Sequence, residues 1–205
     1  ALIEANRLQL QVGQALTLAQ QNSLTRDIIW LEYTDLNGES LLVPRLYSPR
    51  TGKTRYITVI DGEVVIIDGD TENTGLIAGE TIILEGDTDN TGDIDATLIQ
   101  LLNGHYRGSG VITGDTVRMA LASIRNQGHI QAATLAIDST GTLANTGNLS
   151  ANQVDLTAET LTNTGSIAGD TVAITSTGDS LNTGQITGIR SVVLDATGTI
   201  RNGVS

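Results

Sequence analysis

The feature that most constrains this chain is a short internal repeat. An Asn-Thr-Gly triplet, or a variant of it, recurs at steps of 17 to 19 residues through most of the 205-residue sequence. The glycines that close the successive copies are Gly75, Gly92, Gly110, Gly128, Gly147, Gly165, Gly184 and Gly203. A period this short and regular is typical of a solenoid, in which each unit buries its apolar side chains against its neighbours.

Apolar residues stand at fixed distances from each of these glycines. After Gly147 they are Leu149, the pair Val154 and Leu156, and then Leu161. The pair has the two-residue period of a β-strand, and its members in all copies are mostly β-branched residues or leucine. No copy has the apolar spacing of an amphipathic helix. We therefore predict an all-β fold, a right-handed parallel β-helix of about nine coils of 17–19 residues, with neighbouring strands about 4.8 Å apart.

The repeated asparagine has a predicted role of its own. It stands at a corner, where asparagine and glycine tolerate turn conformations that other residues disfavour. Because the asparagines of successive coils occupy the same corner, we expect their side-chain amides to form a ladder along the stack.

The repeat pattern divides the chain into three parts. Residues 3–10 overlay residues 149–156 position by position, so we expect residues 1–18 to form a first coil. Residues 57–205 follow the pattern without a break. Residues 19–56 do not follow it, and we interpret them as an insertion. We expect the chain as a whole to be a fragment of a longer filament.

The insertion differs from the coils in composition. It contains four of the five aromatic residues, both prolines and five of the eleven basic residues. The turn residues from Leu36 to Glu39 lie between two apolar runs, which predicts a β-hairpin. Aromatic and arginine side chains dominate binding interfaces, and insertions in solenoids are often binding loops. The candidate partner-binding residues are Trp30, Tyr33, Arg45, Tyr47, Arg50, Lys53, Arg55 and Tyr56. The alternative is that the insertion braces the β-helix, with Trp30 covering its core.

Acidic residues at one corner suggest a second, weaker candidate site. Asp68 and Asp70 lie one repeat before Glu85 and Asp87, so these carboxylates should stack on one another. Stacked like charges are unfavourable unless a cation or a pKa shift relieves them, and oxygen ligands alone suit calcium. The alternative is a solvated acidic edge, with Arg107 as a counter-charge to Asp89.

Composition argues against several functions. The net charge of −12 disfavours nucleic acid or an anionic membrane surface as a partner. Cysteine is absent, and no apolar run is long enough to be inserted in a membrane. A carbohydrate-active β-helix needs paired carboxylates in a cleft lined by aromatic residues, yet the regular coils contain one tyrosine and no tryptophan. Neither His105 nor His129 has a catalytic partner at a recognisable spacing. We therefore predict no enzymatic activity and no cofactor apart from the calcium considered above.

The repeats resemble those of filamentous haemagglutinins and of the related contact-dependent growth inhibition exoproteins of Gram-negative bacteria. The resemblance rests on residues 161–174 and 147–156, and it covers residues 1–18 and about 57–205. It implies a virulence-associated filament that is exported by two-partner secretion through an outer-membrane transporter and displayed at the cell surface. Such filaments act as adhesins or deliver a C-terminal toxin after contact with a protein or glycan receptor on a target cell. No catalytic residue is implied, and the alternative function is that of a structural spacer in the filament.

Overall fold

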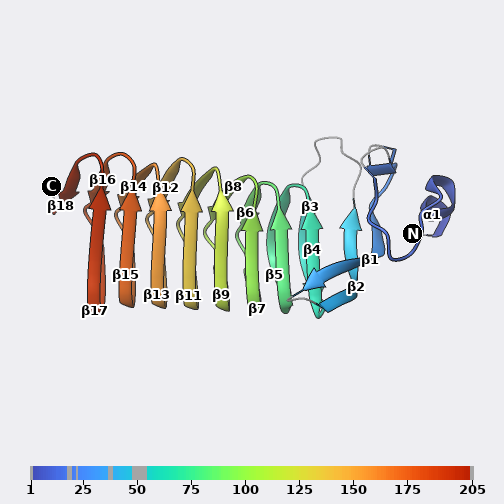
Figure 1. Ribbon diagram of the computed structural model, residues 1–205, viewed down its shortest axis with the longest axis horizontal. Coiled ribbons are helices and arrows are strands. Elements are labelled where there is room, and N and C mark those ends of the chain that lie inside the picture. The colour runs from blue at the N-terminus through green and yellow to red at the C-terminus, as the bar shows by residue number, and fades with distance from the viewer. Residues whose placement is uncertain (1, 18–19, 22, 37–38, 48–54, 204–205) are drawn as a thin grey trace.

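The computed structural model describes residues 2–17, 20–21, 23–36, 39–47 and 55–203. The chain forms one short helix, α1 (Leu2–Leu8), and a parallel β-solenoid of about eight turns, close to the predicted number of coils. The turns stack along the long axis of the molecule, with α1 and the first two strands at the N-terminal end (Figure 1).

Most turns contain one long and one short strand. The N-terminal strands are β1 (Ile28–Leu36), β2 (Glu39–Tyr47), β3 (Arg55–Asp61) and β4 (Val64–Asp68). The long strands that follow are β5 (Thr71–Glu85), β7 (Asp93–Leu102), β9 (Val111–Leu121), β11 (His129–Ser139), β13 (Asn148–Ala158), β15 (Ser166–Ser176) and β17 (Gln185–Ala196). The short strands are β6 (Thr88–Asn90), β8 (His105–Gly108), β10 (Ser123–Asn126), β12 (Thr142–Asn145), β14 (Thr160–Asn163), β16 (Ser180–Asn182) and β18 (Ile200–Asn202).

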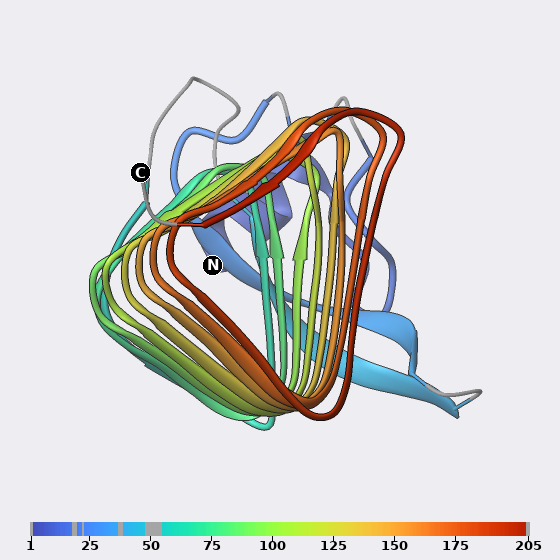
Figure 2. The same ribbon diagram turned by 90° about the vertical axis from the view of Figure 1, so that its left-hand side faces the viewer.

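The pairing of these strands confirms the predicted stacking of the repeats. Each strand of the solenoid pairs in parallel with its equivalent in the next turn, so that Leu149 lies between Ile130 and Ile167. Val154 and Leu156 stack in the same way on equivalent residues of the turns on either side. These side chains are 0–2% exposed and form one continuous core. In cross-section the turns trace a triangle (Figure 2), because each long strand bends to supply two sides and the short strand supplies the third.

The repeated asparagines form the predicted ladder on the inner side of one corner. Asn145 donates its Nδ2 hydrogen to Oδ1 of Asn163 over 2.7 Å, and Asn163 donates to Asn182 over the same distance. Both residues are fully buried. The same contact joins Asn73 to Asn90 over 2.8 Å at the N-terminal end of the stack. The ladder is interrupted in one turn, where Gly108 takes the place of asparagine.

The last complete turn contains one extra residue. The register between β15 and β17 shifts after Gly169, which pairs with Gly188, because Thr171 pairs with Ser191 instead of residue 190. Ile189 lies at this irregularity and is 80% exposed. The extra residue is therefore accommodated as a bulge.

The structure differs from the sequence prediction at the N terminus. Residues 1–18 were expected to form a coil, but Leu2–Leu8 form α1. Ala5 packs into a small core with Leu16, Trp30 and Tyr47, and Glu4 pairs with Arg7 one helical turn away. Residues 5 and 8, like the ion pair between residues 4 and 7, are three positions apart, a spacing that places side chains on one face of a helix. The helix, with the first two strands, forms an N-terminal unit that has its own core.

The predicted hairpin is present within the insertion. Strands β1 and β2 pair in antiparallel register over their full length, from Ile28 opposite Tyr47 to Leu36 opposite Glu39. Among the described residues, two parallel pairs between β2 and β4 connect the backbone of the hairpin to the solenoid, and they involve Arg45 and Leu46. The preceding residue in β2, Pro44, has no N–H group to continue that ladder. The rest of the hairpin extends beyond the triangular outline of the turns (Figure 2).

Candidate partner-binding site

The inner face of the hairpin is part of the N-terminal unit. Because side chains alternate along a strand, Ile28, Trp30 and Glu32 of β1 share this face with Val43 and Tyr47 of β2. All five are buried. The indole Nε1–H of Trp30 donates to the backbone oxygen of Gln11 over 3.3 Å.

This arrangement gives Trp30 and Tyr47 a bracing role. They are 8% and 2% exposed, and they pack against Leu16 and Leu24. Neither ring is presented to a partner, although the composition of the insertion predicts both as candidate binding residues. Of the two alternatives left open by the sequence, the structure supports bracing for these side chains.

A polar network centred on Glu32 fixes the inner face. Arg45 Nη1 donates to Glu32 Oε1 over 2.9 Å, and the hydroxyl group of Tyr47 donates to Glu32 Oε2. Arg45 also lies 3.5 Å from a carboxylate oxygen of Glu85 in β5, which ties the hairpin to the solenoid. Burial lowers the pKa of Arg45, but the hydrogen bond and the charge of Glu32 outweigh this effect, and the pKa is raised. Burial, reinforced by the hydrogen bond to Glu32, raises the pKa of Tyr47 to about 12. Arg45 therefore stays charged and serves the structure.

The outer face of the hairpin is apolar and exposed. Ile29, Leu31 and Tyr33 of β1 lie on it, and Pro44 and Leu42 of β2 stand opposite the last two of these residues. Ile29 and Tyr33 are each 62% exposed, and Leu31 and Leu42 are 41% and 43% exposed. We call these five residues the outer hairpin face. A set of adjacent apolar side chains held open to solvent is a common mark of an interaction surface.

The ring of Tyr33 packs against Gly13. A Cβ atom on Gly13 would lie 2.7 Å from the ring of Tyr33, so only glycine leaves room for this contact. Gly13 has φ of +89°, a conformation that also favours glycine. Its backbone accepts from Tyr33 N and donates to Leu31 O. Tyr33 is the one candidate among the predicted aromatic residues whose described side chain is both exposed and held in place.

The side chains of the other four candidate residues lie outside the part of the chain that the structure describes. Arg50 and Lys53 lie outside the described residues. Arg55 and Tyr56 belong to strand β3, but their side chains are also outside the description. Sequence reasoning missed Ile29, Leu31, Leu42 and Pro44, because an uninterrupted apolar run does not say which residues face outward.

At the acidic corner, acidic residues of adjacent turns lie opposite each other, and two of their carboxylates accept hydrogen bonds from the backbone. Asp68 lies opposite Glu85 in adjacent turns, as predicted. Asp70 Oδ1 accepts from the backbone N–H of Asp87 over 3.1 Å, and Asp87 Oδ1 accepts from that of His105 over 2.9 Å. In the part of the chain that the structure describes, no three acidic or histidine side chains converge in a way that could hold a metal ion. The structure thus supplies hydrogen-bonding roles for Asp70 and Asp87 and no support for calcium.

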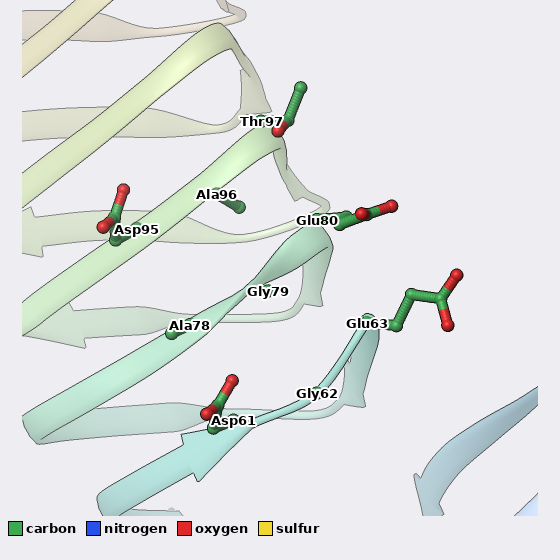
Figure 3. Close-up of a pocket in the computed structure, with 9 residues that line it drawn as sticks. All are labelled: Asp61, Gly62, Glu63, Ala78, Gly79, Glu80, Asp95, Ala96 and Thr97. Atoms are coloured by element: carbon green, nitrogen blue, oxygen red, sulfur yellow. The ribbon is translucent and has the colours of Figure 1, made fainter.

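A shallow groove follows another corner of the solenoid. Its N-terminal part, with a volume of about 580 Å³, has Gly62, Gly79 and Ala96 along its floor. Asp61 and Asp95 lie on one side of it, and Glu63 and Glu80 extend from the other (Figure 3). A Cβ atom on Gly79 would lie 2.3 Å from the backbone oxygen of Gly62, so the floor admits no larger residue there. The groove continues past Gly114 and Ala132 towards Gly169. No aromatic residue lines the described parts of the groove, so it lacks the stacking platform expected of a glycosidase or lyase cleft.

Comparisons with known proteins support the resemblance over part of the chain. No protein-family model and no solved structure matches it. Toxin CdiA of Escherichia coli is 35% identical over 77 residues, which are 37% of this chain. Deoxyribonuclease CdiA of Dickeya dadantii is 32% identical over 78 residues, again 37% of this chain. Protein adenylyltransferase and cysteine protease IbpA of Histophilus somni is 43% identical over 44 residues, or 22% of this chain.

These relatives are far longer than the chain. The matched segments span only 1–2% of their lengths. The chain therefore resembles short stretches of large exoproteins of the filamentous haemagglutinin type. Separately, none of the described segments forms a helix long and apolar enough to cross a membrane.

Proposed function

We propose that this chain is a non-enzymatic segment of a large secreted exoprotein and that its outer hairpin face contacts a partner on a target cell. The stacked turns supply a rigid shaft, and the relatives are large proteins that share its repeats. One observation supports the proposed contact with a partner. Five adjacent apolar residues, including Tyr33, are exposed to solvent at one end of an acidic, aromatic-poor solenoid.

The two faces of the hairpin have different roles. The inner face uses its tryptophan, one tyrosine and Arg45 to attach the hairpin to the shaft. This attachment holds the outer face in a fixed shape before any partner arrives. Preorganised apolar and aromatic side chains bind with a smaller loss of conformational entropy than flexible ones. The receptor, whether protein or glycan, would bury the ring of Tyr33 and the neighbouring aliphatic side chains.

The cellular setting of the proposal rests on the resemblance. The filament would leave a Gram-negative cell through an outer-membrane transporter and remain at the cell surface. There it would act as an adhesin or as the stalk of a growth-inhibition toxin, with no activity of its own in this segment. The absence of cysteine is consistent with transport of an unfolded chain, since no disulfide could form before export.

A second candidate function is that of a spacer. About eight turns at a spacing of about 4.8 Å extend a filament by about 40 Å. The observation that favours it is the regular, mostly polar outer surface of the turns from β11 to β15. A spacer needs no partner, so it predicts that the outer hairpin face can be changed without any effect on binding. The carbohydrate-active alternative has no such support, because no aromatic residue lines the described parts of the groove and its floor is closed to larger side chains.

The test is binding of fluorescently labelled protein to intact bacterial and epithelial cells. A variant carrying Leu31→Ser and Leu42→Ser would run beside the native protein. The matched control is Ile189→Ser, which removes an exposed isoleucine at the other end of the solenoid. Circular dichroism would confirm that all three proteins fold.

The proposal predicts saturable binding that the double variant loses and the control keeps. Binding that survives in the double variant would show that the outer hairpin face is not the contact. If no protein bound any cell, the spacer function would be favoured. New reducing ends released from a polysaccharide panel would contradict the non-enzymatic assignment.

A further inference from the structure

Four polar side chains form a compact group on the side of the solenoid built by the short strands. His105 and Arg107 lie on β8, and Ser123 and Arg125 lie directly opposite them on β10. All four point away from the core, since the alternate residues Tyr106 and Ile124 are buried. This group lies on another part of the molecule from the outer hairpin face, and neither the shaft nor the partner contact proposed above uses it.

The group is bordered by acidic residues on one side only. Asp87 and Asp89 lie in the preceding turn, opposite His105 and Arg107. Asp89 Oδ1 accepts from Arg107 Nε over 2.8 Å, and Asp87 Oδ1 accepts from the backbone N–H of His105. Both carboxylates are therefore engaged on the side of the group that faces β6.

On the other side the positive charge is not balanced. Arg125 is exposed, and no carboxylate of the described residues lies within ion-pair distance of it. Its neighbour in the following turn is Ala144. Arg107 and Arg125 are directly opposite each other on adjacent strands, and like charges in that position repel. A negative group between the two turns would remove this repulsion.

The other two members of the group, His105 and Ser123, contact each other. His105 Nδ1 and Ser123 Oγ are 2.7 Å apart. That contact holds the imidazole ring over β10 and leaves its Nε2 atom without a partner among the described residues. Neighbouring strands are about 4.8 Å apart, and alternate residues along one strand are about 6.6 Å apart. The backbones of the four residues therefore mark the corners of a rectangle of about 4.8 by 6.6 Å, which is small enough for their side chains to converge on one oxyanion.

We propose that His105, Arg107, Ser123 and Arg125 form a binding site for a single oxyanion group, such as a phosphate, sulfate or carboxylate. The guanidinium group of Arg125 supplies a planar fork of donors, which suits two oxygens of such a group. The free N–H groups of Arg107 supply further donors. Because His105 Nδ1 and Ser123 Oγ share one hydrogen bond, the imidazole tautomer decides whether the Ser123 hydroxyl group or His105 Nε2–H donates to the anion. The anion takes the position next to Arg125 that Asp89 takes next to Arg107.

The test uses the full chain with isotope labels and inorganic phosphate as the probe. Side-chain NMR signals of His105 and the arginines would be followed during titration, with total ionic strength held constant by sodium chloride. The site predicts a saturable shift of the His105 ring signals, and Arg125→Gln should weaken binding at least tenfold. Sulfate and acetate titrations would then show whether the site prefers a tetrahedral anion or a planar carboxylate.

The matched control is Arg118→Gln. Arg118 is also exposed and lies on β9 of the same turn, but on a different side of the triangle. This variant should bind phosphate like the native protein. A shift that does not saturate, one that chloride reproduces, or an equal loss in both variants would overturn the proposal, because each would reveal only general charge screening. Circular dichroism would show that both variants remain folded.

Discussion

The hydroxyl group of Tyr106 occupies space that Gly108 leaves empty. A Cβ atom on Gly108 would lie 1.9 Å from the Tyr106 oxygen. The adjacent turns carry Asn90 and Asn126 at this position of the ladder. The tyrosine ring is 1% exposed, and its burial raises the pKa of the hydroxyl group to about 12. Asn126 Oδ1, which the missing asparagine would contact, is buried without a hydrogen bond. Tyr106 and Gly108, the two residues of this turn that depart from the repeat pattern, are therefore one coupled change.

This coupling predicts a reversal in a double variant. Gly108→Asn alone should destabilise the protein by about 1–3 kcal/mol, because the new side chain overlaps the tyrosine. Tyr106→Ile alone should cost about 3 kcal/mol through the cavity that it leaves. The two changes together restore the repeat pattern and supply a donor for Asn126, so the double variant should be at least as stable as the native protein. Denaturant unfolding of all four proteins measures the effect, and additive losses would contradict it.

The asparagine ladder should be a major source of stability. Asn163 is fully buried, accepts from Asn145 and donates to Asn182 and to the backbone oxygen of Gln185. Asn163→Ala would leave these buried groups unpaired, at a cost of about 3 kcal/mol. Asn148→Ala, at an exposed position in β13, is the control and should change stability by less than about 0.5 kcal/mol. Equal effects in thermal unfolding would show that the ladder contributes little.

The N-terminal unit should loosen in acid before the solenoid does. The hydrogen bond from Arg7, with further donors on Thr25, lowers the pKa of Glu4 from 4.5 to about 2. Because the folded state has the lower pKa, the contribution of Glu4 to stability is complete above about pH 4.5. It is lost as the pH falls towards 2, since the unfolded unit takes up the proton more readily.

Trp30 reports on this unit directly, because it is the only tryptophan of the chain and lies in the same small core as Ala5. Its fluorescence should shift to the red between pH 4.5 and pH 2, while the far-ultraviolet circular dichroism of the solenoid persists. Glu4→Gln should show a weaker dependence on pH in this range. An acid profile identical to that of the native protein would mean that Glu4 is not the group responsible.

The sequence predicts the solenoid well because its pattern is repeated. Each apolar position, such as that of Leu149, recurs in every turn, and stacking of like on like is the only arrangement that buries them all. The same repetition misled the prediction at the N terminus. Residues 3–10 match the skeleton of a coil, but Glu4 finds Arg7 and Thr25 as partners in a helix, and these contacts are not visible in an apolar pattern.

The sequence predicts which segment contains the candidate site but not which of its side chains form the exposed surface. Composition singled out the insertion, and Leu36 to Glu39 gave the position of its turn. Which side of the hairpin would be buried depends on where the small core around Leu16 lies, and that core has no signature in the sequence. Trp30 was therefore expected at the contact and lies in the core, whereas Ile29 beside it is exposed.

The most direct test of the account compares Tyr33→Ala with Trp30→Ala in cell binding and in thermal unfolding. Tyr33 stands on the outer hairpin face and Trp30 on the inner face. The account predicts that Tyr33→Ala loses binding with an unchanged melting temperature, whereas Trp30→Ala lowers the melting temperature of the N-terminal unit, at a cost of about 3–5 kcal/mol. Native binding by Tyr33→Ala would contradict the claim that the outer hairpin face meets the partner.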